Sequence, residues 1–154
     1  DLHVINTFGP TETTVSVTQL WLNKQNYKKF SLETVALGQP ITGMDWYLDG
    51  DGDQGEIIIK GPQVANGYFN NLELTKKQFI VCQDGNRGYK TGDWAKKVNG
   101  QIYYCHRIDD QIKIKGHRLE LGEIDMALRT SGVINAKTIY FKGKIFSFIE
   151  KNGL

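Results

Sequence analysis

The chain has 154 residues, 40% of them apolar, and its 19 basic and 17 acidic side chains give a formal net charge of +2. Fifteen of the basic residues are Lys scattered along the chain, so no basic stripe indicates nucleic-acid binding, and no apolar run is long enough to span a membrane. The two cysteines, Cys82 and Cys105, favour reduced thiols of a cytoplasmic protein over a disulfide framework. The chain opens without an initiator Met on a strand-like run, as expected of a fragment.

Short alternating or apolar runs, separated by Gly-containing turns, dominate the first two thirds of the chain. Strands are expected at 3–6, 15–22, 36–37, 46–48, 56–60, 94–98 and 101–105. Asn99-Gly100 between the last two is a strong hairpin signal. A surface loop is expected at 23–30 and one short helix at 72–79. This spacing predicts a distorted barrel or sandwich rather than βαβ units.

The pattern changes after Asp109. An alternating strand is expected at 111–115, followed by an amphipathic helix at 121–131 that ends at Gly132. A hairpin is expected to join 138–141 to 144–149. The predicted fold class is therefore α+β, with a β-rich subdomain over 1–108 and the start of a small α+β domain over 109–154.

The run NTFGPTE, at 6–12, combines residue types that suit a nucleotide. Thr11 can donate to a phosphate oxygen, and Glu12 can hold Mg²⁺, which prefers one or two carboxylates together with phosphate oxygens. Phe8 offers a flat face on which a purine can stack. A plain strand-to-turn corner, with a capping Thr and a solvated Glu, explains the same residues and stays open.

Three further runs bear on function. In YKTGD, at 89–93, Asp93 can accept hydrogen bonds from two adjacent ribose hydroxyls, although an Asp that bonds to its own turn is the commoner use of Gly-Asp. GEIIIKGPQVANGY, at 55–68, is interpreted as a buried strand and loop that support the fold rather than the chemistry. RIDDQIKIKGHRLELGEI, at 107–124, joins a charged turn, a strand, a glycine-arginine corner and a helix start, which is typical of a mobile connection.

Along the chain the four runs follow one another as NTFGPTE, GEIIIKGPQVANGY, YKTGD and RIDDQIKIKGHRLELGEI. In that order they resemble the second half of the adenylate-forming (AMP-binding) enzymes, and the resemblance covers nearly the whole chain. Within that superfamily the chain is most similar to the amino-acid-activating branch. Two groups there are candidates: D-alanine–D-alanyl carrier protein ligases, which charge a carrier for teichoic acid D-alanylation, and nonribosomal peptide synthetase adenylation domains. NTFGPTETTVSVT and the compact DGDQGEIIIKG connection favour the first group.

The resemblance implies a ligase that uses ATP and Mg²⁺ to adenylate an amino acid, D-alanine first among the candidates, and then transfers it to the phosphopantetheine thiol of a carrier protein. It implies that Asn6, Phe8, Gly9, Thr11, Asp93 and Arg107 bind the nucleotide. Phe8 would stack on adenine, where the family usually has Tyr. Thr11 would bind the α-phosphate, Glu12 would hold Mg²⁺, and Asp93 would bind the ribose.

The remaining implied roles concern the connection after Arg107. Asp109 would be the hinge about which the small domain turns, and Gly116 would line the tunnel for the pantetheine arm. His106 departs from the pattern, which has Gly before this Arg. The family's upstream phosphate-gripping loop and its C-terminal catalytic Lys are absent from these 154 residues, so the isolated chain is expected to be inactive. An acyl-CoA synthetase relative and a non-catalytic module that binds AMP or a carrier remain alternatives.

Overall fold

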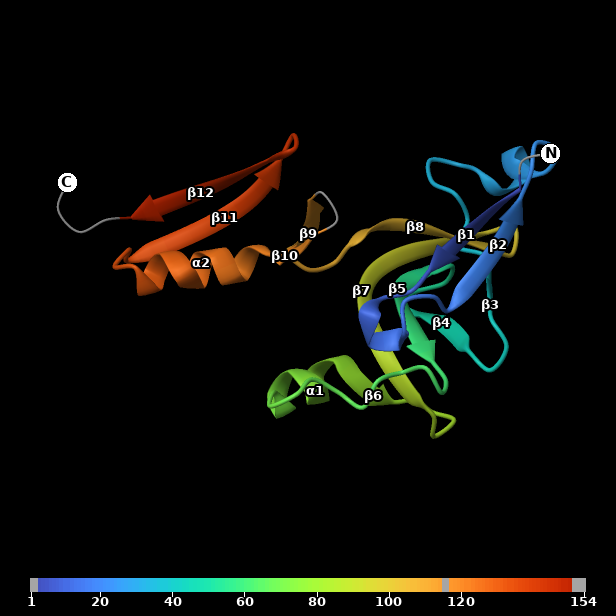
Figure 1. The fold of residues 1–154 in the computed structure, drawn as a ribbon, viewed down its shortest axis with the longest axis horizontal. Helices are drawn as coiled ribbons and strands as arrows, with labels where there is room; N and C mark the ends of the chain where they lie inside the picture. Colours follow the sequence, from blue (N-terminus) through green and yellow to red (C-terminus); the bar gives the residue numbers. More distant parts are fainter. Residues whose placement is uncertain (1–2, 115–116, 151–154) are drawn as a thin grey trace. The chain divides into compact units, whose positions relative to one another are not determined.

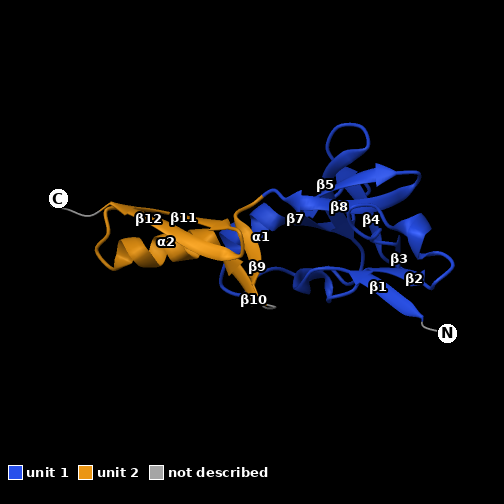
Figure 2. Cartoon of the chain, turned by 90° about the horizontal axis from the view of Figure 1, so that it is seen from above, with its two compact units in different colours: residues 1–108 blue, residues 109–154 orange. Residues whose placement is uncertain are grey.

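The computed structural model describes residues 3–114 and 117–150 (Figure 1). The chain divides into two compact units, Asp1–Ile108 and Asp109–Leu154 (Figure 2). The assignment of these units to the large and small domains of a longer enzyme stays a prediction. Along the described part of the chain, no helix has both the length and the apolar character needed to cross a membrane.

The first sheet of unit 1 has three antiparallel strands in the order β1-β2-β3. They are β1 (Val4–Phe8), β2 (Thr18–Leu22) and β3 (Gln39–Pro40). The connection from β1 to β2 contains a single 3₁₀ turn, Thr11–Thr13, followed by left-handed backbone at Thr14 (φ 62°) and Val15 (φ 70°). A left-handed β-branched residue is costly, so this corner is held by its surroundings rather than by local preference.

The second sheet of unit 1 runs in the order β4-β5-β7-β6, and β8 also pairs with β7. Its strands are β4 (Asp45–Asp49), β5 (Gln54–Lys60), β6 (Phe79–Val81), β7 (Arg87–Val98) and β8 (Gln101–Arg107). Helix α1 (Leu72–Gln78) precedes β6, and its N-cap Asn71 accepts a hydrogen bond from the Leu74 amide at 3.0 Å. A second 3₁₀ turn, Tyr27–Phe30, lies in the segment between β2 and β3.

Strand β5 lies at the centre of the unit 1 core. Ile57, Ile58 and Ile59 are each at most 2% exposed, although successive side chains of a strand point to opposite faces. The strand is therefore covered on both faces, which explains its unbroken apolar run. The core cluster also includes Val17, Leu37, Met44, Val64, Phe79, Tyr89, Ala95 and Ile102.

The described residues of unit 2, 109–114 and 117–150, form two antiparallel strand pairs and one helix. Its elements are β9 (Gln111–Ile114), β10 (His117–Glu120), α2 (Leu121–Thr130), β11 (Asn135–Phe141) and β12 (Lys144–Glu150). Gly132 follows α2 with φ +99°, and its amide donates to the Arg129 carbonyl, so a glycine ends this helix by capping it.

The predicted α+β class, the 94–98/101–105 hairpin and both helices are confirmed. Two strand predictions were wrong. The strand expected at 15–22 begins only at Thr18, because the preceding left-handed turn cannot join a ladder. No strand forms at 36–37: the Leu37 amide donates instead to the Ile102 carbonyl at 2.8 Å, and the strand follows at β3. Strands β6 and β10 were not predicted from the sequence.

Candidate functional site

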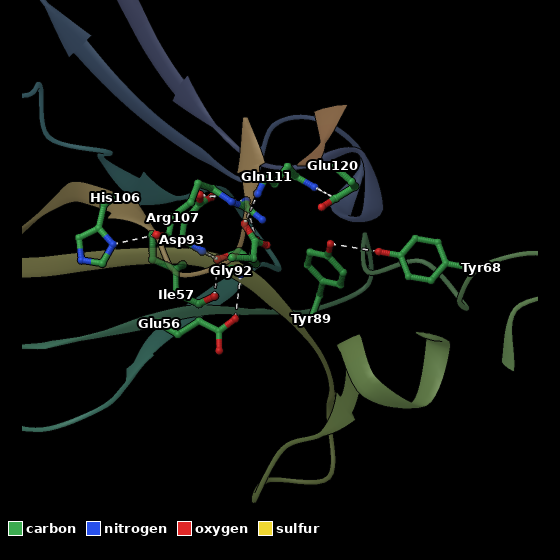
Figure 3. A network of polar contacts seen from close by, with 12 residues as sticks. Glu56, Ile57, Tyr68, Tyr89, Gly92, Asp93, His106, Arg107, Gln111 and Glu120 are labelled. Carbon is green, nitrogen blue, oxygen red and sulfur yellow. Dashed lines mark hydrogen bonds and ion pairs between the residues drawn. The ribbon is translucent and has the colours of Figure 1, made fainter. Parts of the chain in front are cut away.

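The carboxylate predicted to bind ribose lies beside the predicted nucleotide-binding arginine. Asp93 of β7 and Arg107 of β8 are opposite each other in the strand register, and Arg107 Nη1 lies 3.0 Å from Asp93 Oδ1 (Figure 3). Arg107 Nη1 also donates to the Thr91 carbonyl at 2.8 Å. Because Asp93 is only 8% exposed, the guanidinium offsets part of the cost of removing this carboxylate from water.

An irregularity in the pairing of β5 with β7 shapes the turn that carries Asp93. Glu56 is paired with Trp94 and Ile58 with Lys90, so three residues of β7 lie opposite Ile57 alone. Gly92 lies in that stretch with φ +73°, a backbone conformation that glycine adopts without strain. The result is a β-bulge, a feature that redirects side chains at functional sites.

Hydrogen bonds from neighbouring residues pair the polar groups of the bulge (Figure 3). Glu56 Oε1 accepts from the Gly92 amide at 2.8 Å, and Thr91 Oγ1 donates to the Ile57 carbonyl at 2.8 Å. The Asp93 amide donates to Thr91 Oγ1 at 3.0 Å. Glu56 is 7% exposed, and Lys90 Nζ lies 3.6 Å from its Oε2. Since buried polar groups need partners, this arrangement fixes the backbone from Thr91 to Asp93.

The corner after β1 holds the other predicted residues. Asn6 Nδ2 donates to the Ala36 carbonyl at 2.8 Å, which ties β1 to the segment before β3. A Cβ at Gly9 would lie 2.8 Å from the Val15 carbonyl oxygen, so only glycine fits there. The side chain of Thr11 is exposed, and Glu12 is half-buried. The structure thus gives Asn6 and Gly9 packing roles and leaves Thr11 accessible to a ligand.

Phe8 is half-buried, and part of its ring packs against the core of unit 1. It borders a small, partly open apolar pocket together with Leu37 and Trp46. Its predicted stacking on adenine stays a prediction, and the core contacts fix the ring in place whether or not a base lies on it.

A chain of hydroxyl groups connects Glu12 to the interior. Tyr68 Oη donates to Glu12 Oε1 at 2.8 Å and lies 3.2 Å from the hydroxyl of Tyr89, which is 1% exposed. Burial, followed by the hydrogen bonds to Tyr89 and Glu12, raises the pKa of Tyr68 well above its ordinary value. The phenol therefore stays protonated at neutral pH and remains a donor to the carboxylate.

The loop that carries Tyr68 is itself tied to the corner. The Ala65 amide donates to the Glu12 carbonyl at 2.8 Å, and Arg87 Nε donates to the Ala65 carbonyl at 2.9 Å. The Arg87 guanidinium also lies over the ring of Phe79, 5.1 Å from its centroid. The loop over 61–68, which the sequence indicated to be only structural, thus supports the candidate site.

The donor set at this corner suits a cation that shares its coordination with phosphates. Glu12 supplies a single carboxylate, and among the residues that the structure describes no group of three or more His, Cys, Asp or Glu side chains could hold a metal ion. Mg²⁺ is commonly bound through one or two carboxylates plus substrate phosphates. Glu12 fits Mg²⁺ on that condition and does not form a metal site by itself.

The predicted hinge lies at the first residue of unit 2. Asp109 Oδ1 accepts from the Gln111 amide at 3.2 Å, a local turn bond, and Asp110 Oδ2 lies 2.8 Å from Lys137 Nζ. Gly116, predicted to line the pantetheine tunnel, lies outside the described residues. The exposed His106 stacks on Trp94 with ring centroids 6.3 Å apart and an interplanar angle of 12°.

Several supporting residues were missed at the sequence level. Glu56 and Thr91 hold the Asp93 turn, and Tyr68 contacts Glu12. The signals were weak: an acidic residue heading an apolar run, a hydroxyl beside Gly-Asp, and an aromatic residue ending a Gly-containing loop.

Known proteins match this chain in sequence and in fold. The sequence model described as AMP-binding enzyme matches residues 2–69. A D-alanine–D-alanyl carrier protein ligase of Bacillus cytotoxicus is 38% identical over 141 residues, which make up 88% of this chain and 28% of the relative. The chain is a relative of the AMP-binding enzymes. It spans little more than a quarter of the length of the curated relatives that it matches.

Solved adenylation proteins share the fold. Holo-PA1221, a nonribosomal peptide synthetase protein with adenylation and PCP domains, aligns with a TM-score of 0.78 and 25% identity over 95% of this chain and 28% of its own. The adenylation domain AlmE of Vibrio cholerae, solved with glycyl-adenosine-5'-phosphate, gives a TM-score of 0.77 and 26% identity over 96% of this chain and 31% of its own. The resemblance to the amino-acid-activating branch is therefore confirmed.

Proposed function

We propose that this chain is part of an ATP-dependent ligase that activates an amino acid, D-alanine first among the candidates, for a carrier protein. In the first step a carboxylate oxygen of the amino acid attacks the α-phosphorus of ATP, and pyrophosphate leaves. In the second step the phosphopantetheine thiol of the carrier attacks the acyl carbon, and AMP leaves. The D-alanine–D-alanyl carrier protein ligases among the relatives support this choice.

The observation that carries the proposal is the adjacency of Asp93 and Arg107. A carboxylate held at 3.0 Å by a guanidinium, on a bulge with its backbone fixed, is a preorganised acceptor for the two ribose hydroxyls. Arg107, 21% exposed in its side chain, contacts the ribose or a phosphate of the same nucleotide. A positive charge beside the nucleotide favours its anionic groups.

The corner after β1 binds the two parts of the nucleotide that flank the ribose, the base and the phosphates. Thr11 donates its exposed hydroxyl to the α-phosphate, Phe8 stacks on adenine, and Gly9 and Asn6 keep the corner close to the pocket. Glu12 holds Mg²⁺, which neutralises developing charge on the phosphate oxygens when it is bound.

Further assignments extend the proposal to the whole protein. Asp109 is the hinge about which the small domain turns between the two half-reactions, and Gly116 leaves room for the pantetheine arm. Both ATP as substrate and the free thiols of Cys82 and Cys105 suit a cytoplasmic protein that serves teichoic acid D-alanylation.

A second candidate function is supported by the similarity to holo-PA1221. A nonribosomal peptide synthetase adenylation domain would share the nucleotide site and the carrier, and it would differ in the amino acid. An acyl-CoA synthetase would share the adenylation step but not the acceptor. A module that only binds AMP or a carrier would catalyse neither step.

Titration with AMP tests the nucleotide site directly. Asp93→Ala removes the acceptor for both ribose hydroxyls, so we expect the AMP affinity of the chain to fall at least about tenfold, since one hydrogen bond to a charged group contributes about 1.5–3 kcal/mol. Isothermal titration calorimetry measures the loss. Asp51→Ala, at an exposed turn carboxylate, serves as the control and should bind AMP like the unaltered chain.

Equal affinity in Asp93→Ala and the unaltered chain would contradict the ribose site. The chain alone is also expected to show no amino-acid-dependent exchange of pyrophosphate into ATP, because the upstream loop and the catalytic Lys of the family are not among its 154 residues. Robust exchange would overturn that expectation.

A further inference from the structure

We infer that Tyr68 is a positioning residue for Glu12, holding the carboxylate in the orientation that binds a divalent cation beside the phosphates of the nucleotide. The inference rests on the proposed function, because it concerns the same nucleotide site. It adds a residue from a loop that lies 56 positions away from Glu12 in the sequence.

The direction of the hydrogen bonds follows from counting protons. A phenol has one proton to donate, and Tyr68 donates it to Glu12 Oε1 at 2.8 Å. The same Tyr68 oxygen lies 3.2 Å from Tyr89 Oη. Because Tyr68 has no second proton to donate, Tyr89 must be the donor in this hydrogen bond. The chain therefore runs from Tyr89 through Tyr68 to Glu12, and each bond polarises the next toward the carboxylate.

Tyr68 is held firmly enough to act as a fixed support. Its amide donates to Thr75 Oγ1 at 2.9 Å, and its ring meets Phe79 edge-on at a centroid distance of 5.4 Å. A Cβ at Gly67, where φ is +141°, would lie 2.4 Å from Thr75 Cγ2, so the backbone just before Tyr68 packs directly against α1. Tyr89 is anchored in the core.

Glu12, in contrast, lies on a short 3₁₀ turn in front of two left-handed residues. A long side chain in such a place loses rotamer freedom when it binds a cation. A hydrogen bond from a fixed phenol removes part of that freedom beforehand. Because the donor is neutral, it leaves the negative charge of the carboxylate available to the cation.

The test compares ATP binding with and without Mg²⁺. For the unaltered chain and for each variant, calorimetry gives the ATP affinity in EDTA and in saturating Mg²⁺, and the ratio of the two is the Mg²⁺ enhancement. We expect Tyr68→Phe to lower this enhancement about tenfold, while the ATP affinity in EDTA changes less than about twofold. Glu12→Gln should abolish the enhancement.

Two further variants serve as controls. Tyr47→Phe removes a phenol hydroxyl that contacts Cys82 elsewhere in the same unit, and it should keep the full enhancement. Tyr89→Phe removes the hydroxyl that donates to Tyr68 and leaves the Tyr68–Glu12 hydrogen bond in place, so a smaller loss of about threefold is expected. It also keeps the inference testable if Tyr68→Phe does not fold, and thermal melting of every variant shows which ones do.

The outcomes separate the inference from the proposed function. If the unaltered chain does not bind ATP, or Asp93→Ala binds it equally well, the nucleotide site is wrong and the inference falls with it. If Asp93→Ala loses ATP while Tyr68→Phe and Tyr89→Phe keep the full Mg²⁺ enhancement, only the positioning role is wrong. An equal loss of affinity in EDTA and in Mg²⁺ would make Tyr68 a structural residue and would also overturn the inference.

Discussion

The two halves of the candidate site are built in different ways. The half proposed to bind ribose, Asp93 and Arg107, lies on paired strands of the larger sheet, and its turn is hydrogen-bonded to the buried Glu56 and Thr91. The half proposed to bind phosphate, Thr11 and Glu12, lies on a 3₁₀ turn between two strands of the smaller sheet. We call them the ribose half and the phosphate half.

The difference indicates where each half obtains its rigidity. At the ribose half, the strand ladders and the buried bulge fix the carboxylate before any ligand arrives. The phosphate half depends on contacts from other segments, chiefly the Ala65 amide and the Tyr68 phenol. Substitutions under the ribose half should therefore reduce folding stability and binding together, whereas substitution of the exposed Thr11 in the phosphate half should reduce binding alone.

The largest effect is expected for Glu56→Ala, which tests whether the buried bulge fixes the ribose half. The substitution leaves the Gly92 amide without its acceptor in the interior, and an unsatisfied buried donor costs about 1–3 kcal/mol. Chemical denaturation should show this loss in the free energy of unfolding, and the AMP affinity should fall as the Asp93 turn loosens.

Glu56→Gln is the matched control, because its carbonyl oxygen still accepts from the Gly92 amide while the charge facing Lys90 is removed. It should retain more of the stability and of the AMP affinity than Glu56→Ala. If Glu56→Ala keeps both the free energy of unfolding and the AMP affinity of the unaltered chain, the bulge does not hold the ribose half.

The sequence predicted best what depends on near neighbours. The hairpin at Asn99-Gly100 and the helix that ends at Gly132 follow from turn chemistry and periodicity within a few residues. Asp93 and Thr11 were proposed as site residues because their short motifs carry their own chemical signature, and their roles stay predictions.

The supporting residues were missed because their role depends on distant pairing. Glu56 reaches Gly92 across 36 positions, and only because the register of β5 and β7 shifts between Glu56 and Ile58. A shift of this kind leaves no mark in a hydrophobic pattern, since Ile57, Ile58 and Ile59 are buried in any register. Likewise, Tyr68 was indistinguishable in sequence from an aromatic residue that only fills the core.

A smaller effect is expected for Thr11→Ala, which tests the opposite half. The hydroxyl of Thr11 is exposed, so its loss should leave the melting temperature unchanged and lower the ATP affinity about fivefold, as expected for one hydrogen bond of about 1 kcal/mol. Thr11→Ser should retain the affinity.

Thr13, two residues further along the chain, is a contrasting control, to be measured by the same calorimetry and thermal melting. It is fully buried, and its Oγ1 donates to the Pro10 carbonyl at 3.1 Å, so Thr13→Ala should lower the melting temperature. An unchanged ATP affinity in Thr11→Ala would remove the phosphate contact from the proposal.

The smallest effect is expected at an ion pair near the other end of β5, where the stabilising contacts are exposed. Lys60 Nζ lies 2.5 Å from Asp84 Oδ2 and 3.3 Å from Asp45 Oδ2, and the hydrogen bond from Lys60 lowers the pKa of Asp84 from 3.8 to about 2. Because the pKa is lower in the folded state, the pair stabilises the fold above about pH 4 and loses that contribution as the pH falls toward 2.

Asp84→Asn should remove this part of the acid dependence in thermal melts, by a small amount because exposed ion pairs contribute little. At neutral pH the same variant should bind AMP like the unaltered chain, since Lys60 is paired with Gly88 in the β5–β7 register, outside the bulge at Gly92. A loss of AMP affinity in Asp84→Asn would mean that the ribose half depends on the whole length of β5. The buried hydrogen bonds around Gly92 would then not be sufficient to hold Asp93.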